Sequence, residues 1–196
     1  MTLLAVLIAA SLSVVKPDTL VLDSEASVVK WKGTKFFGLG KHEGIVRLSD
    51  GYVALAGERI IGARFVVDMR SIDVTDIPPD DPVPRNRLRN HLMDEDFFAV
   101  ARYPTSIFML RSAVPQGEDA GFRLTGDLTM RGVTRPITVD VEVHPAADGL
   151  VRATSRFRIN RHNWGVSFRG SRLTNDLVDD DLHFTLEFVL RPRRPQ

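Results

Sequence analysis

The sequence has no cysteine among its 196 residues. This absence excludes disulfides, thiolate metal ligands, cysteine nucleophiles and the acylated cysteine of a lipoprotein. An excess of charge of one sign is also lacking, because the formal net charge is only +1. We therefore expect no overall electrostatic attraction to nucleic acid or to an anionic membrane. Hydrophobic residues make up 43% of the chain and charged residues 26%, a balance that predicts a folded domain rather than a disordered one.

The sequence also lacks a run long enough for a membrane-spanning helix. The apolar stretch from Leu3 to Val15 is interrupted only by Ser11 and Ser13, and it is shorter than the roughly 20 residues such a helix needs. Its length is typical of the core of a signal peptide, although no basic residue precedes it. We expect residues 1–15 to direct export, without stable membrane insertion; an uncleaved amphipathic or core segment is the alternative. Residues 16–27 then form a linker, 28–190 the folded domain and 191–196 a polar tail.

Motifs of catalysis and metal binding are missing too. The five histidines show no i,i+4 spacing, and there is no G-x-S-x-G motif, Ser-His-Asp pattern or phosphate loop. The acidic stretches 73–81 and 176–181 lack the regular oxygen spacing of an EF-hand, so ordinary turns are the favoured interpretation over calcium sites. We expect no metal and no cofactor.

What is present is alternation. Apolar and polar residues alternate on both sides of Arg131–Arg135, and this period of two predicts two strands, each with one apolar face. Gly132 suits the short connection between them, and Pro136, which lacks a backbone donor, is expected at the first position of the second strand. The segment therefore predicts a β-hairpin. The inward positions would be Phe122, Leu124, Leu128, Met130, Ile137, Val139, Val141 and Val143.

Similar alternation predicts about eight antiparallel strands in all. A first strand is expected near Leu20–Asp23, a long one from Ile61 to Met69 and a last one from Leu182 to Leu190, while Asp50-Gly51 is typical of a hairpin turn. The proline-rich segment 77–84 is predicted to be irregular and to lead into a short helix from Asn86, its N-cap, to Met93. An eight-stranded barrel has room for one small ligand, but alternation alone does not distinguish it from a filled barrel or a β-sandwich.

Several segments resemble one known family. Gly126-Asp127-Leu128-Thr129 followed by Gly132-Val133-Thr134 and Pro136 is similar to the signature of the YceI-like proteins, which bind lipids and polyisoprenoids. Upstream of it, His91–Phe98 and Tyr103-Pro104-Thr105 lie in the family's order, and downstream Asn163–Val166 and Asn175–Asp180 resemble its C-terminal segments. The resemblance implies an all-β, lipocalin-like antiparallel barrel with one short helix near an opening, and a binding, non-catalytic role. It also implies a long-chain isoprenoid or quinone-like lipid as the ligand. With the predicted export signal at residues 1–15, we expect a periplasmic location.

Large apolar side chains on the predicted inner faces are the candidates for contact with such a lipid. They are Trp31, Phe65, Phe108, Leu128, Trp164 and Phe184. Basic side chains that would suit an anionic lipid head, or simply a solvated rim, are Lys32, Lys35, Arg131, Arg135, Arg161, Arg169 and Arg172.

Two other classes of function stay open. A filled barrel would serve a structural or partner-binding role, and its large side chains would form a solid core. An enzyme would need a carboxylate–histidine pair, for which Asp127, His162 and Asp176 are the candidates. Whether the chain acts alone or as a homodimer is also open.

Overall fold

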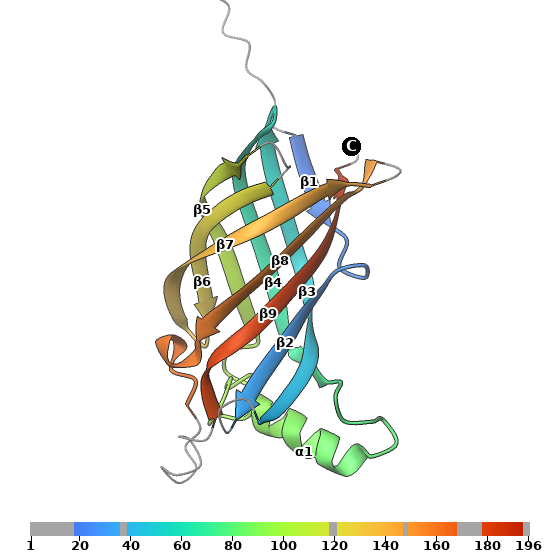
Figure 1. Ribbon diagram of the computed structural model, residues 1–196, viewed down its shortest axis with the longest axis vertical. Coiled ribbons are helices and arrows are strands. Elements are labelled where there is room, and N and C mark those ends of the chain that lie inside the picture. Colours follow the sequence, from blue (N-terminus) through green and yellow to red (C-terminus); the bar gives the residue numbers. More distant parts are fainter. Residues whose placement is uncertain (1–17, 36–38, 118–120, 147–148, 168–177, 194–196) are drawn as a thin grey trace, which may run out of the picture.

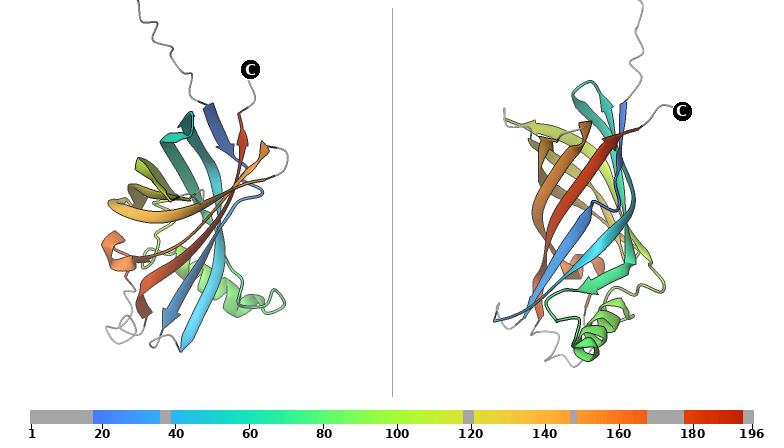
Figure 2. Two further views of the ribbon diagram at one scale, coloured as in Figure 1. Left: turned by 45° about the horizontal axis from the view of Figure 1, so that its top comes forward. Right: turned by 90° about the vertical axis from the view of Figure 1, so that its right-hand side faces the viewer.

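The fold was established from a computed structural model, which describes residues 18–35, 39–117, 121–146, 149–167 and 178–193. Strands and one α-helix make up most of this part of the chain (Figures 1 and 2). In chain order, the elements are β1 (Asp18–Leu22), β2 (Val28–Lys35), β3 (Gly40–Ala56), β4 (Arg59–Val74), α1 (Pro82–Met93), β5 (Thr105–Gln116), β6 (Gly121–Met130), β7 (Val133–Pro145), β8 (Val151–Asn160), the 3-10 helix η2 (Arg161–Trp164) and β9 (Val178–Pro192).

The strands close into an antiparallel barrel. The hydrogen-bonded order is β1-β3-β2-β9-β8-β7-β6-β5-β4, and β3 also pairs with β4, which joins the two ends of the sheet. The short strands β1 and β2 share one position, because each lies between β3 and β9. The result is an eight-position barrel with one helix, as predicted. Residues 18–22 form β1 in the barrel wall, so the first strand expected near Leu20–Asp23 is present, within the range 16–27 that was also expected to be a linker.

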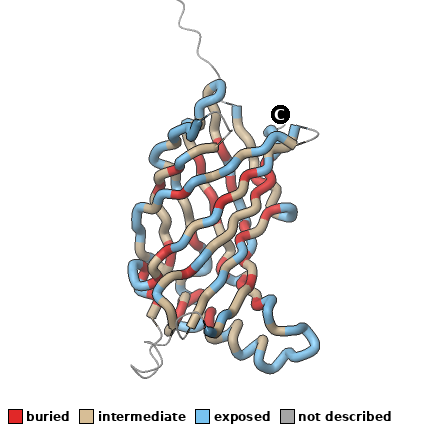
Figure 3. Tube along the Cα trace, viewed as in Figure 1, coloured by how far each residue is buried: buried red, intermediate tan, exposed pale blue. Residues whose placement is uncertain are grey.

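The alternation of the strands sets the inside of the barrel. Ala63, Phe65 and Met69 of β4 are buried, as the period of two predicts. Ile61, predicted to face the same way, is half exposed. The β3–β4 ladder shifts its register between the pairs that involve Gly62 and Ile60, and this irregularity brings Ile60 instead to the inner face. Figure 3 shows buried positions along the strands and exposed ones at the strand tips and around α1.

The predicted hairpin turn at Asp50-Gly51 is wrong. Both residues lie inside β3, which continues to Ala56 and turns at Gly57-Glu58. Gly51 pairs across the sheet with Phe65, and the ring of Phe65 fills the space in which a side chain at position 51 would lie. The glycine therefore serves packing rather than a turn, a role that the local sequence does not distinguish.

The hairpin of β6 and β7 is confirmed, with a tighter turn than predicted. Met130 pairs with Val133, so Arg131 and Gly132 alone form the connection, with φ of 51° and 73°. Positive φ at both central residues is the geometry of a type I′ turn, whose twist suits two antiparallel strands. Pro136 is consequently the fourth residue of β7 rather than the first. It tolerates this position because β7 pairs with β8 only from Val141 onwards, so no strand on that side requires its missing N–H.

The helix is longer than predicted. It begins at Pro82, with Asp81 as its N-cap residue, rather than at Asn86. Pro82 and Pro84 lie in the first turn, where backbone N–H groups have no partner within the helix, so the prolines lose no hydrogen bond there. The predicted end is confirmed, since Met93 is the last helical residue. In Figure 1 the helix lies across the lower end of the barrel.

Candidate functional site

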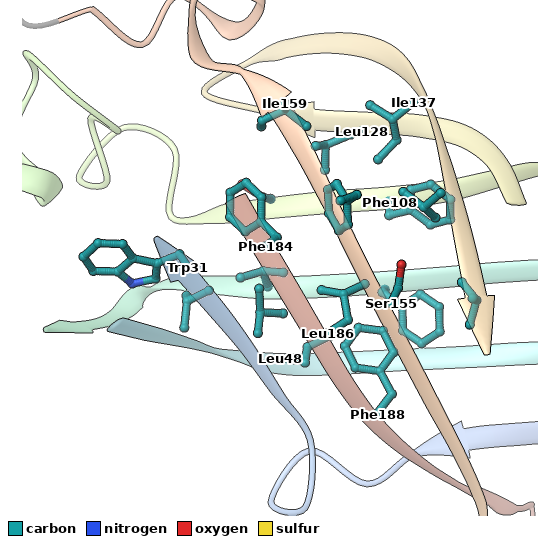
Figure 4. A pocket seen from close by; sticks show the side chains of 18 of the residues that line it. Trp31, Leu48, Phe108, Leu128, Ile137, Ser155, Ile159, Phe184, Leu186 and Phe188 are labelled. Atoms are coloured by element: carbon teal, nitrogen blue, oxygen red, sulfur yellow. The ribbon is translucent and has the colours of Figure 1, made fainter. Parts of the chain in front are cut away.

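The barrel encloses an elongated apolar cavity of about 470 Å³. Every strand contributes side chains to its wall, and α1 contributes Leu88, His91 and Leu92 at the lower end. Most of the lining is aliphatic or aromatic. Figure 4 shows side chains from several strands, including Trp31, Leu48, Phe108, Phe184 and Phe188, that gather around this space. The interior is therefore hollow rather than filled, which was the question that alternation left open.

Aromatic rings form much of the wall in pairs. The rings of Phe157 and Phe184 stack with centroids 5.4 Å apart, and those of Phe65 and Phe188 tilt against each other at 4.9 Å. These distances lie within the range in which aromatic pairs attract each other. The pairs join neighbouring or facing strands and leave ring faces and edges for contact with an apolar ligand.

Three of the rings lie over glycines of neighbouring strands. Trp31 covers Gly44, Phe65 covers Gly51 and Phe108 covers Gly126, and a Cβ atom at any of these glycines would collide with the ring. The glycines let the rings lie against the wall, since a side chain beneath would push each ring toward the centre of the barrel. The packing role of these glycines was not predicted, since Gly51 was expected in a turn and Gly126 was noted only within the family signature. Their positions opposite large aromatic residues are the signal that could have identified this role.

Five of the six predicted contact residues line the cavity: Trp31, Phe65, Phe108, Leu128 and Phe184. The sixth, Trp164, is buried to 2% exposure but is not part of the lining. Its Nε1 donates a hydrogen bond to the backbone oxygen of Leu128 at 3.0 Å. It lies in η2, which directly follows β8, on the side where β8 no longer pairs with β7. Trp164 thus supports the wall from behind instead of facing the cavity.

Polar groups concentrate at the ends of the cavity. Thr34, Lys35, His42 and His91 line it toward α1, and Glu58 lines it at the opposite end. His42 Nδ1 lies 2.9 Å from Asp76, and Thr34 hydrogen-bonds to Asp179. Between the ends, two buried serines reach the wall. Ser155 Oγ donates a hydrogen bond to the backbone oxygen of Asp140 at 2.6 Å, whereas Ser106 Oγ has no hydrogen-bond partner among the described residues.

The candidate catalytic residues are not brought together. Asp127 accepts a hydrogen bond from Arg111 at 2.7 Å, and His162 lies 2.7 Å from Asp180. Neither Asp127 nor His162 lines the cavity, and Asp176 lies outside the described residues. In the acidic stretch 73–81, Asp73 contacts Arg85 and Asp76 contacts His42, so both carboxylates already have cationic or hydrogen-bonding partners.

Three of the seven predicted basic contacts serve the scaffold. Arg131 donates to the backbone oxygens of Gly165 and Glu95, and Arg135 to that of Asn163. Arg161 is 1% exposed and donates to three backbone oxygens around η2, and burial lowers the pKa of its guanidinium below the usual value. Lys35 lines the cavity and Lys32 does not. Arg169 and Arg172, like the proposed export signal at 3–15, lie outside the described residues.

Comparison with known proteins identifies the family. A model of the YceI-like domain matches residues 20–190. The chain belongs to the YceI-like family. This YceI-like domain is 40% identical over 53 residues to protein YceI of Escherichia coli O17:K52:H18, and 41% identical over 99 residues to a UPF0312 protein of Pseudomonas syringae pv. tomato. The matched segments span 27% and 50% of those relatives' lengths and 27% and 48% of the chain.

Solved structures share the fold of the YceI-like domain. BcnA of Burkholderia cenocepacia superimposes with a TM-score of 0.71 at 20% identity, over 86% of this chain and 98% of that one. A polyisoprenoid binding domain from Saccharophagus degradans superimposes with a TM-score of 0.64 at 16% identity, over 89% and 98% of the two chains. Among the described residues of this YceI-like domain, no helix combines the length and apolar character that a membrane crossing requires.

Proposed function

We propose that this YceI-like domain binds one long apolar lipid, a polyisoprenoid or quinone-like molecule, inside its barrel, and that it acts as a carrier rather than as an enzyme. The apolar cavity of about 470 Å³ carries the proposal, because a structural barrel needs no such space. Its volume lies within the usual range of ligand pockets, roughly 300–1,000 Å³. The similar fold of a polyisoprenoid binding domain from Saccharophagus degradans supports the choice of ligand class.

The hydrophobic effect is sufficient for this function. Burial of one methylene contributes about 0.8 kcal/mol, so a five-carbon isoprene unit contributes roughly 3–4 kcal/mol. A few such units in a preformed cavity reach micromolar affinity after the cost of association. Trp31, Phe65, Phe108, Leu128 and Phe184 are the proposed contacts, whereas Trp164 holds the strand that carries Leu128. The unpaired hydroxyl of Ser106 offers a hydrogen bond to a polar end of the ligand.

We also propose that the protein is exported and works in the periplasm. The apolar segment from Leu3 to Val15, with the small residues that signal peptidases accept, supports this location. N-terminal sequencing of the protein from its own host should give a first residue between Ser11 and Thr19. A mature protein that retains Met1 would contradict export without affecting the lipid-binding proposal.

Native mass spectrometry of the protein purified from its own host tests the proposed function. We expect a mass increment that matches one lipid for each barrel and disappears after delipidation. The same spectrum reports whether the chain is a monomer or a homodimer. Delipidated protein should then bind a prenyl alcohol such as geranylgeraniol. Failure of both measurements, no bound lipid and no uptake, would support a structural or partner-binding role instead.

A further inference from the structure

A second cavity lies outside the barrel, between α1 and β4. Its volume is about 440 Å³, and its lining is mainly polar, in contrast to the interior of the barrel. From β4 it includes Arg70, Ser71 and Asp73, and from α1 it includes Arg85, Asn86 and Arg89. We refer to these six residues as the arginine pocket. The buried side chain of Ile72 contributes to the linings of both the arginine pocket and the apolar cavity.

Positive charge exceeds negative charge in the arginine pocket. Asp73 is its one carboxylate, and it accepts a hydrogen bond from Arg85 at 2.6 Å. Arg70 pairs with Asp68, which stands outside the pocket, at 2.8 Å, and this hydrogen bond holds the pKa of Asp68 below its usual value. Two of the three arginines therefore have a carboxylate partner within the protein.

Arg89 has no such partner among the described residues. Its Nε is buried and makes no hydrogen bond. A buried donor on a charged group that lacks an acceptor is costly, and an ion or water that completes the site is the ordinary explanation. Ser71 does not provide the missing acceptor, because its hydroxyl oxygen accepts from the backbone N–H of Arg47 at 2.8 Å while its proton goes to the backbone oxygen of Asp68.

The helix reinforces the need for an anion. Arg85 and Arg89 are one turn apart on α1, so their like charges lie close together and destabilise the helix. The first turn of α1 contains no acidic residue that would offset them. An anion between these two side chains would relieve the repulsion and provide Arg89 with an acceptor.

We propose that the arginine pocket binds a phosphate-type oxyanion. Guanidinium groups bind phosphate oxygens with paired hydrogen bonds, and three of them provide more donors than a single carboxylate can accept. Two sources share this chemistry: a small free phosphate or pyrophosphate, and the head group of a phosphorylated lipid. The second source rests on the proposed lipid-binding function, and the side chain of Ile72, which lines both cavities, brings the two sites next to each other.

Calorimetric titration of the delipidated full-length protein with inorganic pyrophosphate at low ionic strength tests the pocket. We expect saturable binding that Arg89→Gln weakens by roughly tenfold or more, the effect of losing one charge-assisted contact. Arg87→Gln is the matched control, because Arg87 is an exposed arginine of the same helix outside the pocket. Arg70→Gln, which alters β4 rather than the helix, should also weaken binding and covers the case that Arg89→Gln fails to fold.

The proposal would be overturned if pyrophosphate showed no saturable binding. It would also be overturned if Arg87→Gln and Arg89→Gln weakened binding equally, because that result would indicate only a general attraction to positive charge. Farnesyl phosphate and farnesol distinguish the two sources. If farnesyl phosphate binds more tightly than farnesol and Arg89→Gln removes this difference, the result supports a lipid head group. If farnesyl phosphate and farnesol bind equally while pyrophosphate binding is saturable, the result supports a free anion. Farnesol alone reports on the barrel, so its failure to bind would contradict the proposed function while the pyrophosphate titration still tests the pocket.

Discussion

The ring of Phe65 on β4 lies across Gly51 on β3, directly opposite in the ladder. Any side chain at position 51 would occupy the space of the ring and approach Leu22 as well. Phe65 also contacts Phe188, so its ring is held between a glycine on one side and another ring on the other. Gly51 therefore lets the ring of Phe65 lie against the wall, and the space at the centre of the cavity depends on it.

Gly51→Ala should therefore destabilise the barrel. Overpacking forces the ring of Phe65 away from the wall, and we expect a loss of roughly 1–3 kcal/mol in the free energy of unfolding, with weaker binding of a prenyl lipid. Gly62→Ala is the control, because a Cβ there meets only Ala54 at an ordinary 3.7 Å, and it should change stability by less than about 0.5 kcal/mol. In a Phe65→Ala background the cost of Gly51→Ala should largely vanish, and additive effects would contradict this explanation.

Phe108→Ala separates a cavity wall from a solid core. Because Phe108 lines an existing space, its removal should cost less than the ~3–5 kcal/mol typical of Phe→Ala in a close-packed interior, while prenyl-lipid affinity changes markedly. Met109→Ala is the matched control, since the adjacent side chain is 45% exposed and should not affect lipid binding. Chemical denaturation must use delipidated protein, because a bound ligand stabilises the native state. A full core-type loss with unaltered affinity would remove Phe108 from the proposed contacts.

Trp164→Phe tests a supporting role behind the wall. The change removes the hydrogen bond to Leu128, and we expect a loss of ~0.5–1.5 kcal/mol in stability with little change in lipid affinity. Trp31→Phe is the comparison, because it also removes an indole hydrogen bond, to the oxygen of Ile45, but alters the cavity itself. Lipid titrations of both variants decide the matter: an equal effect on affinity would show that Trp164 reaches the ligand.

Gly132→Ala tests the hairpin turn. At φ of 73° an alanine is strained, and its Cβ would also meet the ring of Tyr103. Gly57 has a similar φ of 60° but nothing within 4 Å of a Cβ, so Gly57→Ala measures the backbone term alone, about 1 kcal/mol. We expect the larger loss of stability in Gly132→Ala, measured by denaturant unfolding, and Gly132→Val should also cost at least ~1 kcal/mol. Equal losses for the two alanine variants would show that Tyr103 moves aside freely.

The strands and the central hairpin could be predicted because a period of two is a local property of the chain. Apolar residues alternate from Phe122 to Val143, and Phe122 and Leu124 pair with Val141 and Val139 across the hairpin. Gly51 shows where local signals fail, since Asp-Gly is typical of a turn and only the ring of Phe65, on another strand, overrides it. The prediction of where α1 begins was wrong for a related reason, because proline breaks the interior of a helix but is accepted in its first turn.

The site depended on contacts between distant segments. Side-chain direction on a strand identified Phe65 and Phe184, and the family resemblance indicated Phe108, whose strand has two apolar faces. Trp164 follows a strand end, where alternation no longer indicates direction. Whether the barrel is hollow depends on the summed volume of all inward side chains, which no single segment reveals. The arginine pocket likewise combines a strand and a helix whose basic residues have no common spacing.

The way the barrel closes has a consequence for the order of events in the cell. β9, which follows the other described strands in the chain, pairs with β1, β2 and β8, so the wall cannot close until residues 178–192 are available. Contacts between the two ends of a chain form slowly, because the chain loses the entropy of a long loop before strand pairing stabilises the contact. During synthesis the incomplete sheet exposes its apolar face and an unpaired edge, the features that make partly folded chains aggregate. This topology delays closure of the barrel until β9 is available, and the interval before closure is the time at which the chain is most exposed to aggregation.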